Sequence, residues 1–156
     1  MKPETVHEGQ PLLATGELLE NALAAMILIH GRGGFARQIL ALTSHFQVRN
    51  FAYLAPQAAG GTWYPQRFIV PRVRNQPHLD SALRVIDGLV DQITQAGIAP
   101  AQIMFLGFSQ GACLASEYVA RHQQRFGGLV VLSGGLIGAD EELVGYDSAL
   151  VGTPVF

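Results

Sequence analysis

The chain has 156 residues, of which 49% are hydrophobic and 14% charged, and its formal net charge is -2. This length lies within the usual span of one domain, so we predict a single domain over residues 1–156 with a well-buried core. The charge gives no reason to expect nucleic acid or an anionic membrane as partner. The longest uninterrupted apolar run, residues 22–29, falls far short of the roughly 20 residues that a membrane span needs.

Two features of the sequence bear on its compartment. The first 20 residues lack the basic start and the apolar run of a secretion signal. Cys113 is the only cysteine, which excludes an internal disulfide and fits a reducing compartment. We therefore expect a cytoplasmic protein.

Short apolar runs alternate with longer segments of helical period, which is typical of a parallel sheet covered by helices. Residues 10–17 are predicted as an edge strand of a hairpin, 24–31 and 51–56 as buried strands, and 33–46 as a helix whose one face holds Phe35, Ile39, Leu42 and Phe46. After a long loop, apolar residues recur at helical spacing from Leu79 to Ile93, with Gly97 and Pro100 beyond the end. The remaining predicted elements are strands over 102–109 and 127–134, a helix over 110–122, and the opening of a further strand over 153–156.

Residues 107–111 read Gly-Phe-Ser-Gln-Gly, where a predicted strand turns into a predicted helix. Gly107 and Gly111 leave room for a sharp turn, which presents the Ser109 hydroxyl above the sheet as a nucleophile. The helix N-terminus also aims free backbone N–H groups at the space beside Ser109, which suits a developing oxyanion. A serine N-cap between turn glycines is the purely structural alternative, and the strand and helix on either side favour the nucleophile.

A second glycine cluster, His-Gly-Arg-Gly-Gly at residues 30–34, also follows a predicted strand. Gly31-x-Gly33-x-x-Ala36 matches a loose dinucleotide fingerprint, which also needs an acidic residue about 20 positions later. No Asp or Glu occurs from residue 21 to residue 79. A hydrolase instead needs a second oxyanion donor from this loop, and the Arg32 amide is well placed to supply it. We favour the hydrolase, while a glycine turn that only lets strand and helix pack stays open.

Five segments occur in order from about residue 24 to the end: LIHGRGG, AYLAPQAAGGTWYP, GFSQGACLASEY, LSGGLIG and GTPVF. They resemble the phospholipase/carboxylesterase family of α/β hydrolases, the group that includes acyl-protein thioesterases. The resemblance implies an α/β-hydrolase fold, a mostly parallel sheet with helices on both faces. It further implies that Ser109 attacks an ester or thioester carbonyl and that the backbone N–H groups of Arg32 and Gln110 hold the oxyanion.

The same resemblance implies that small esters or acyl chains bind beside residues 57–75, where Trp63 and Tyr64 match an aromatic pair of the family. The aromatic residues of the 63–68 stretch either line an apolar pocket or plug the core under a long loop, and the sequence leaves both open. No metal and no organic cofactor is implied.

The resemblance places the triad aspartate and histidine after the strand that GTPVF begins, so both are expected beyond Phe156. The fold is then expected to lack its last strand and helices. A strand left unpartnered in this way favours a dimer or poor solubility. Without a base the chain by itself is expected to show almost no turnover, and a non-catalytic remnant that binds a ligand or partner is the alternative function.

Residues that are present offer poor replacements for the triad. His122 lies thirteen residues after Ser109 on the same predicted helix, which places it about 20 Å away. His30 could lie close to Ser109, but the His-Gly of such a loop usually orients the loop. Three other histidines have no motif around them: His7, His45 and His78. Four acids follow the strand at 127–134, where some α/β hydrolases place the triad acid, and a solvated acidic loop is the simpler account of them: Asp140, Glu141, Glu142 and Asp147.

Overall fold

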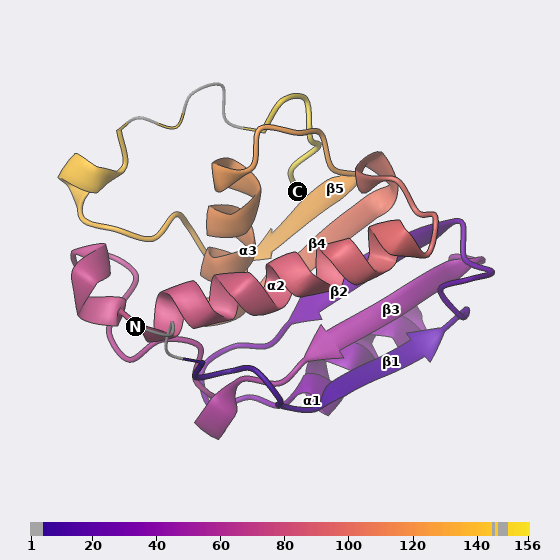
Figure 1. Ribbon diagram of the computed structural model, residues 1–156, viewed down its shortest axis with the longest axis horizontal. Helices are drawn as coiled ribbons and strands as arrows, with labels where there is room; N and C mark the ends of the chain where they lie inside the picture. The colour runs from indigo at the N-terminus through magenta and orange to yellow at the C-terminus, as the bar shows by residue number, and fades with distance from the viewer. Residues whose placement is uncertain (1–4, 145, 147–149) are drawn as a thin grey trace.

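The computed structural model describes residues 5–144, 146 and 150–156, and its centre is a five-stranded sheet in the order β1-β3-β2-β4-β5 (Figure 1). The strands are β1 (Leu12–Gly16), β2 (Ala24–Ile29), β3 (Phe51–Pro56), β4 (Ile103–Phe108) and β5 (Gly128–Leu132). Only the pairing of β1 with β3 is antiparallel, and the other named pairs are parallel. The predicted mostly parallel sheet of an α/β protein is confirmed.

Helices cover both faces of this sheet. In Figure 1, α2 (His78–Gln95) and α3 (Gln110–Arg121) lie in front of the strands, and α1 (Ala36–Leu40) lies behind them. Alternate residues of a strand point to opposite faces, and β2 shows this directly. Ile27 and Ile29 pack in the core cluster that holds the α2 and α3 residues, whereas Met26 and Leu28 pack in the cluster that holds the α1 residues.

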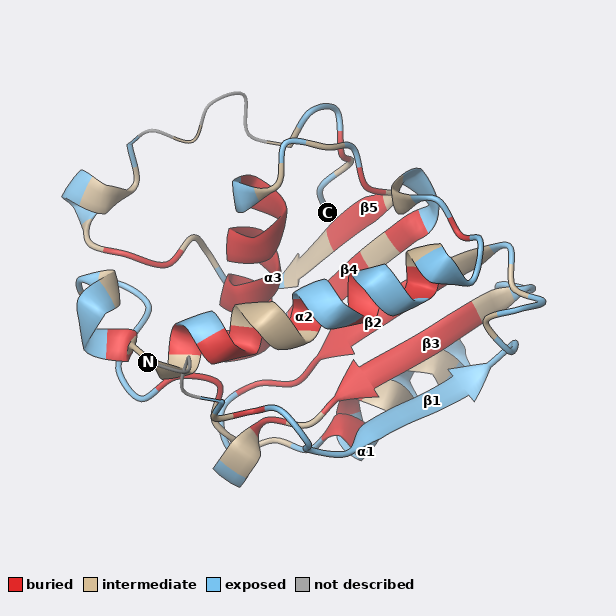
Figure 2. Cartoon of the chain, in the orientation of Figure 1, coloured by how far each residue is buried: buried red, intermediate tan, exposed pale blue. Residues whose placement is uncertain are grey.

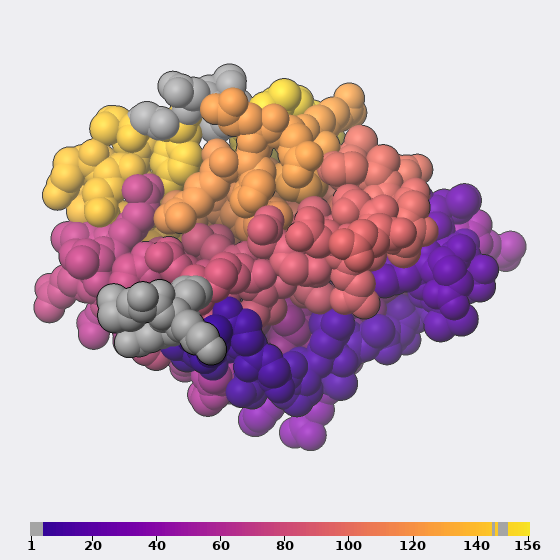
Figure 3. Space-filling view, in the orientation of Figure 1, coloured from indigo at the N-terminus to yellow at the C-terminus, as the bar shows by residue number. Residues whose placement is uncertain are grey.

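Helix α2 follows the prediction most closely. Its buried residues recur at helical spacing, which turns one face to the sheet: Leu79, Ala82, Ile86, Leu89, Val90 and Ile93. Gly97 lies just after the C-cap with φ of +100°, so the helix ends where the sequence predicted. In the space-filling view this region crosses the middle of the visible face, with the N-terminal segment below it and the segment after β5 above it (Figure 3).

The predicted helix over 33–46 is shorter in the structure. Helix α1 spans only Ala36–Leu40 and continues as the 3-10 helix η1 (Ala41–His45). A 3-10 helix has three residues per turn, so the face predicted from a 3.6-residue period does not continue past Leu40. Phe35 is 47% exposed and Leu42 is 38% exposed, whereas Ala36 and Ile39 are the buried residues.

The two ends of the sheet also differ from expectation. The N-terminal strand is an edge strand, as predicted, but its partner is β3 and not the next strand, so it forms no hairpin; Figure 2 shows it exposed beside the buried central strands. At the other edge, Val155 forms an isolated parallel bridge with Leu129 instead of a full strand.

Four further 3-10 helices lie in the loops: η2 (Ala59–Gly61), η3 (Arg72–Asn75), η4 (Pro100–Gln102) and η5 (Asp140–Glu142). Within the residues that the structure describes, no helix combines the length and the apolar character that crossing a membrane requires.

Candidate active site

The chain turns sharply from β4 into α3 at Ser109. This residue has φ of +52° and ψ of -115°, a conformation that residues with a side chain rarely adopt. The flanking glycines are required by close backbone contact. A Cβ at Gly107 would lie 2.3 Å from the Gly111 carbonyl oxygen, and a Cβ at Gly111 would lie 2.1 Å from the Ile29 carbonyl oxygen. The turn therefore packs directly against the end of β2.

The loop after β2 lies beside Ser109 because β2 and β4 are neighbouring parallel strands. Ile29 pairs with Gly107, so both strands end at the same edge of the sheet. In the sheet, β3 lies on one side of β2 and β4 lies on the other, so the strand order reverses direction at β2. Open α/β sheets bind ligands at the carboxyl ends of the strands at such a point. A Cβ at Gly31 would lie 3.4 Å from the Ser109 Cβ, so the two loops are in contact.

Some of the backbone amides around Ser109 have a hydrogen-bond acceptor within the protein, and others do not. Four amides of the loop after β2 donate within the protein: Gly33 to Gly61 O at 2.7 Å, Gly34 to Gly31 O at 3.0 Å, Phe35 to Gln38 Oε1 at 3.1 Å and Ala36 to Gln57 Oε1 at 2.8 Å. Ser109 donates its own N–H to Leu132 O at 2.8 Å. Neither the Arg32 amide nor the Gln110 amide has an acceptor among the described residues.

The same hydrogen bonds argue against the dinucleotide interpretation of the second glycine cluster. A pyrophosphate needs free amides at the start of a helix, and the loop amides from Gly33 to Ala36 already have acceptors. The helix that follows has five residues.

His30 is held by the loop that it precedes. Its Nδ1–H donates to Gly31 O at 2.7 Å, and its Nε2 accepts the Ala58 N–H at 3.0 Å. Burial lowers the pKa of this imidazole, which keeps the ring neutral and able to accept at Nε2. Because both ring nitrogens are engaged, His30 orients the loop, as the sequence interpretation favoured.

The other candidate partners for Ser109 lie elsewhere. His122 is the C-cap of α3, where its Nδ1–H donates to Tyr118 O at 2.6 Å. Among the described residues, no histidine ring is hydrogen bonded to Ser109. Glu142 accepts the Ala139 and Arg72 backbone N–H groups, which lower the pKa of this carboxyl and make it an anchor of the η5 loop. Asp140 and Glu141 belong to η5 as well, and Asp147 lies outside the described residues.

Trp63 and Tyr64 lie beneath the site. They are 0% and 1% exposed. Of the two interpretations that the sequence left open, these two side chains therefore fit the one in which aromatic residues plug the core under a long loop. The Trp63 indole N–H donates to His30 O at 2.9 Å. Their predicted contact with substrate stays a prediction. The sequence predicted a role for the backbone amide of Gln110. The Gln110 side chain also binds the backbone of Trp63 and Tyr64, and no local sequence pattern predicts that contact.

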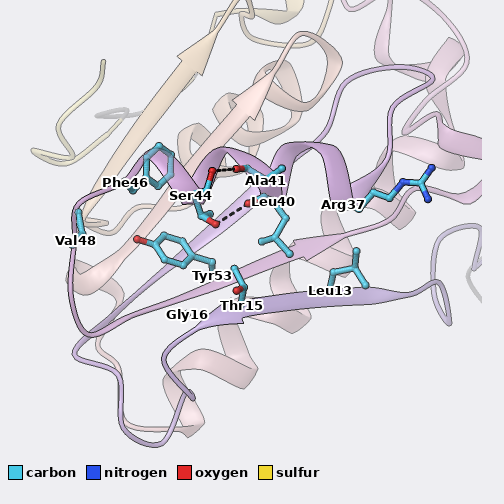
Figure 4. A pocket seen from close by; sticks show the side chains of 11 residues that line it. Leu13, Thr15, Gly16, Arg37, Leu40, Ala41, Ser44, Phe46, Val48 and Tyr53 are labelled. Carbon is cyan, nitrogen blue, oxygen red and sulfur yellow. Dashed lines mark hydrogen bonds between the residues drawn. The ribbon is translucent and has the colours of Figure 1, made fainter.

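An apolar hollow of about 400 Å³ lies beside the Ser109 turn. Its lining includes residues of the loop after β2 and five large apolar side chains: Phe35, Ile39, Leu42, Phe108 and Leu132. None of the residues 57–75 lines it. A second hollow of about 500 Å³ lies between β1 and the α1–η1 segment (Figure 4), and none of the predicted site residues lines that one.

Comparison with known proteins gives this geometry a family. A crystal structure of a phospholipase/carboxylesterase from Dyadobacter fermentans DSM 18053 is 39% identical to the chain, with a TM-score of 0.91 over 99% of this chain and 74% of that one. Acyl-protein thioesterase 1 of Saccharomyces cerevisiae is 33% identical over 136 residues, which covers 74% of this chain and 60% of the relative. Lysophospholipase-like protein 1 of Mus musculus is 38% identical over 56 residues, 36% of this chain and 23% of the relative.

The chain thus spans less than two thirds of the length of either curated relative. The model of the phospholipase/carboxylesterase family matches residues 17–142, which include both glycine-bearing loops and every strand from β2 to β5. On this match the chain belongs to the phospholipase/carboxylesterase family of α/β hydrolases.

Proposed function

We propose that this chain carries the nucleophile and the oxyanion-binding amides of a hydrolase that cleaves carboxylic esters or thioesters. The observation that carries the proposal is the meeting of two loops at Ser109. The serine occupies a strained turn, and two amides without acceptors, those of Arg32 and Gln110, belong to the loops on either side of it. Backbone donors placed in this way are worth about 10²–10³ in rate each.

The reaction proposed is acyl transfer. Ser109 Oγ bonds to the carbonyl carbon while its proton passes to a base, and the carbonyl oxygen becomes an oxyanion held by the two amides. The C–O or C–S bond then breaks as the leaving group takes a proton. Water hydrolyses the acyl-enzyme in the second half of the reaction, and Ser109 regains its proton.

The base and its acid partner are proposed to lie outside these 156 residues. His30 uses both ring nitrogens within the loop, and His122 binds its own helix, so neither is placed to accept the Ser109 proton. A histidine supported by an aspartate is the partner that such a serine needs.

The substrate class follows from the apolar hollow. An acyl group fits a site lined by Phe108, Leu132 and Ile39 next to the nucleophile, and the related proteins are named for esters and thioesters. In this proposal Trp63 and Tyr64 shape the site from beneath. A metal or organic cofactor has no part in the proposed reaction.

A fluorophosphonate probe tests this function. The probe's phosphorus bonds to the serine oxygen as fluoride leaves and the serine proton passes to solvent, so intact mass and peptide mapping report the labelled residue. Because the base is proposed to lie outside these residues, we expect slow labelling at Ser109, assisted by the Arg32 and Gln110 amides, that is lost in Ser109→Ala and kept in Ser116→Ala. Ser116 lies on the same helix, and its hydroxyl donates to Ala112 O. Steady-state ester turnover by the chain alone should exceed the uncatalysed rate in water by no more than about 10³–10⁴-fold.

The same experiment decides between enzyme and remnant. Tight binding of an acyl ligand without Ser109-dependent labelling would support the non-catalytic module. Turnover at the rate of an intact esterase would contradict the proposal that the base lies outside these residues.

A further inference from the structure

The two proposed oxyanion residues share a second feature, because their side chains bind the same short segment, residues 63–66. Gln110 Oε1 accepts the Trp63 N–H at 2.8 Å, and Gln110 Nε2 donates to Tyr64 O at 2.7 Å. The Arg32 guanidinium donates from one nitrogen to Pro65 O at 3.0 Å and from the other to Gln66 O at 2.8 Å. Four consecutive residues are thus bound by two side chains from two different loops.

The 63–66 segment is itself fixed from below. The buried Trp63 ring donates to His30 O at 2.9 Å, and the Trp63 carbonyl accepts His7 Nε2–H at 2.8 Å. The fully buried Asn75 accepts the Gln66 N–H at 2.7 Å through Oδ1. The segment is therefore an ordered support and not a free loop.

We propose that the Arg32 and Gln110 side chains are positioning groups that fix the separation of their own two amides through the 63–66 segment. This inference rests on the proposed function, because it assigns a purpose to the distance between the two oxyanion donors. The donors belong to loops after different strands, so packing within one loop cannot fix both. A misplacement of about 1 Å at such a site can cost about 100-fold in rate.

Arginine suits this role better than lysine. Its planar fork donates in two fixed directions, which lets one guanidinium bind two successive carbonyls, whereas an ammonium is a point donor on a flexible stem. Arg32 is exposed at the surface, so its replacement removes the two hydrogen bonds without opening the core. Gln110 is 5% exposed and its replacement carries a greater risk to folding, which makes Arg32 the cleaner test.

The first measurement is the rate of fluorophosphonate labelling at Ser109 as a function of probe concentration. We expect Arg32→Met to lower the limiting rate about 10- to 100-fold while the half-saturating concentration and the melting temperature stay close to those of the unmodified chain. Arg32→Lys should give an intermediate rate. Arg49→Met is the matched control, an exposed arginine of the same acid-free stretch, and should label like the unmodified chain.

The second measurement needs no chemistry at Ser109. In two-dimensional NMR spectra, Arg32→Met should shift the backbone amide signal of Gln110 and accelerate its hydrogen exchange, because the two are linked through residues 63–66. Arg49→Met should leave that signal in place. A coupling between Arg32→Met and Gln110→Met in the labelling rate is also expected, since both act on one segment.

The outcomes separate the two proposals. Absence of labelling in the unmodified chain would overturn the proposed function, and the positioning role with it. Labelling of the unmodified chain, together with an equal rate in Arg32→Met, would overturn the positioning role alone. A slower rate with an unmoved Gln110 amide would also overturn it, because the link through residues 63–66 would then be wrong.

Discussion

Two loops meet at the candidate site, and they are held in different ways. The turn at residues 107–111 is fixed by backbone packing, since Gly107 contacts the Gly111 carbonyl and Gly111 contacts the end of β2. The loop at residues 30–35 is fixed largely by side chains. These include its own His30 and Arg32, and Gln57, which lies outside the loop. One half of the site thus depends on glycines that allow close backbone contact, and the other half depends on side-chain contacts with the segment after β3.

The largest effect is expected where a side chain is added to the backbone-packed turn. Gly111→Ala places a Cβ 2.1 Å from a main-chain oxygen that cannot rotate away, so the free energy of unfolding should fall by about 3 kcal/mol or more. Gly88→Ala is the control, because Gly88 lies in α2 with nothing within 4 Å of its added Cβ. That variant should gain up to about 1 kcal/mol.

Urea unfolding of both variants checks this prediction. Equal stabilities for the two alanine variants would show that the turn has room to adapt, and would remove the contrast between the loops.

Acidification should weaken the side-chain-held loop. His30 Nε2 accepts the Ala58 N–H and His7 Nδ1 accepts the Ala59 N–H, and burial lowers the pKa of both rings. A histidine with a lowered folded pKa gives its full stabilisation above the unfolded value of about 6.5 and loses it as the pH falls toward the folded value. Each ring contributes at most about 1.4 kcal/mol per pH unit.

The measurement is the urea midpoint between pH 8 and pH 5, above the range in which carboxylates titrate. The His78 ring centroid lies 6.2 Å from that of His7, and its charge adds to the lowering of the His7 pKa, whereas the charge of Glu8 raises that pKa. His30→Gln should flatten the pH dependence. A midpoint that does not fall toward pH 5 would contradict the prediction.

The smallest effect is expected at the proposed nucleophile. Ser109 has φ of +52°, which glycine adopts without strain. Ser109→Gly should therefore be more stable than Ser109→Ala by about 1 kcal/mol, because only glycine relieves the backbone. Chemical denaturation of this pair measures the strain that the turn holds. A glycine variant less stable than the alanine variant would show that the strain is smaller than the entropy that glycine adds to the unfolded chain.

How much of this could be predicted depends on the range of the contacts. Strands β2 to β5 and helices α2 and α3 follow periodic runs and turn residues close in sequence, and these were predicted within a few residues. The Gly-x-Ser-x-Gly turn is likewise a local pattern. The partner of β1 is a strand distant in the sequence, which no local pattern predicts, and the sequence also predicted too long an α-helix over residues 33–46.

The contacts that organise the second loop were beyond local patterns. Gln110 binds residues that precede it by more than forty positions, and Arg32 binds residues more than thirty positions later. The hollow beside Ser109 was also beyond local patterns. Phe108 and Leu132 lie near the α1 residues that line it only because of the order of the strands in the sheet.

The pairing of Ile29 with Gly107 has a consequence for how this domain can vary in length. One residue inserted into β2 or β4 would displace the following loop by about 3.3 Å and reverse which side chains face each layer. Insertions and deletions should therefore be absent from residues 24–31 and 103–111 in relatives that keep the activity. Residues 47–49, between η1 and β3, belong to no strand, and length differences should accumulate there.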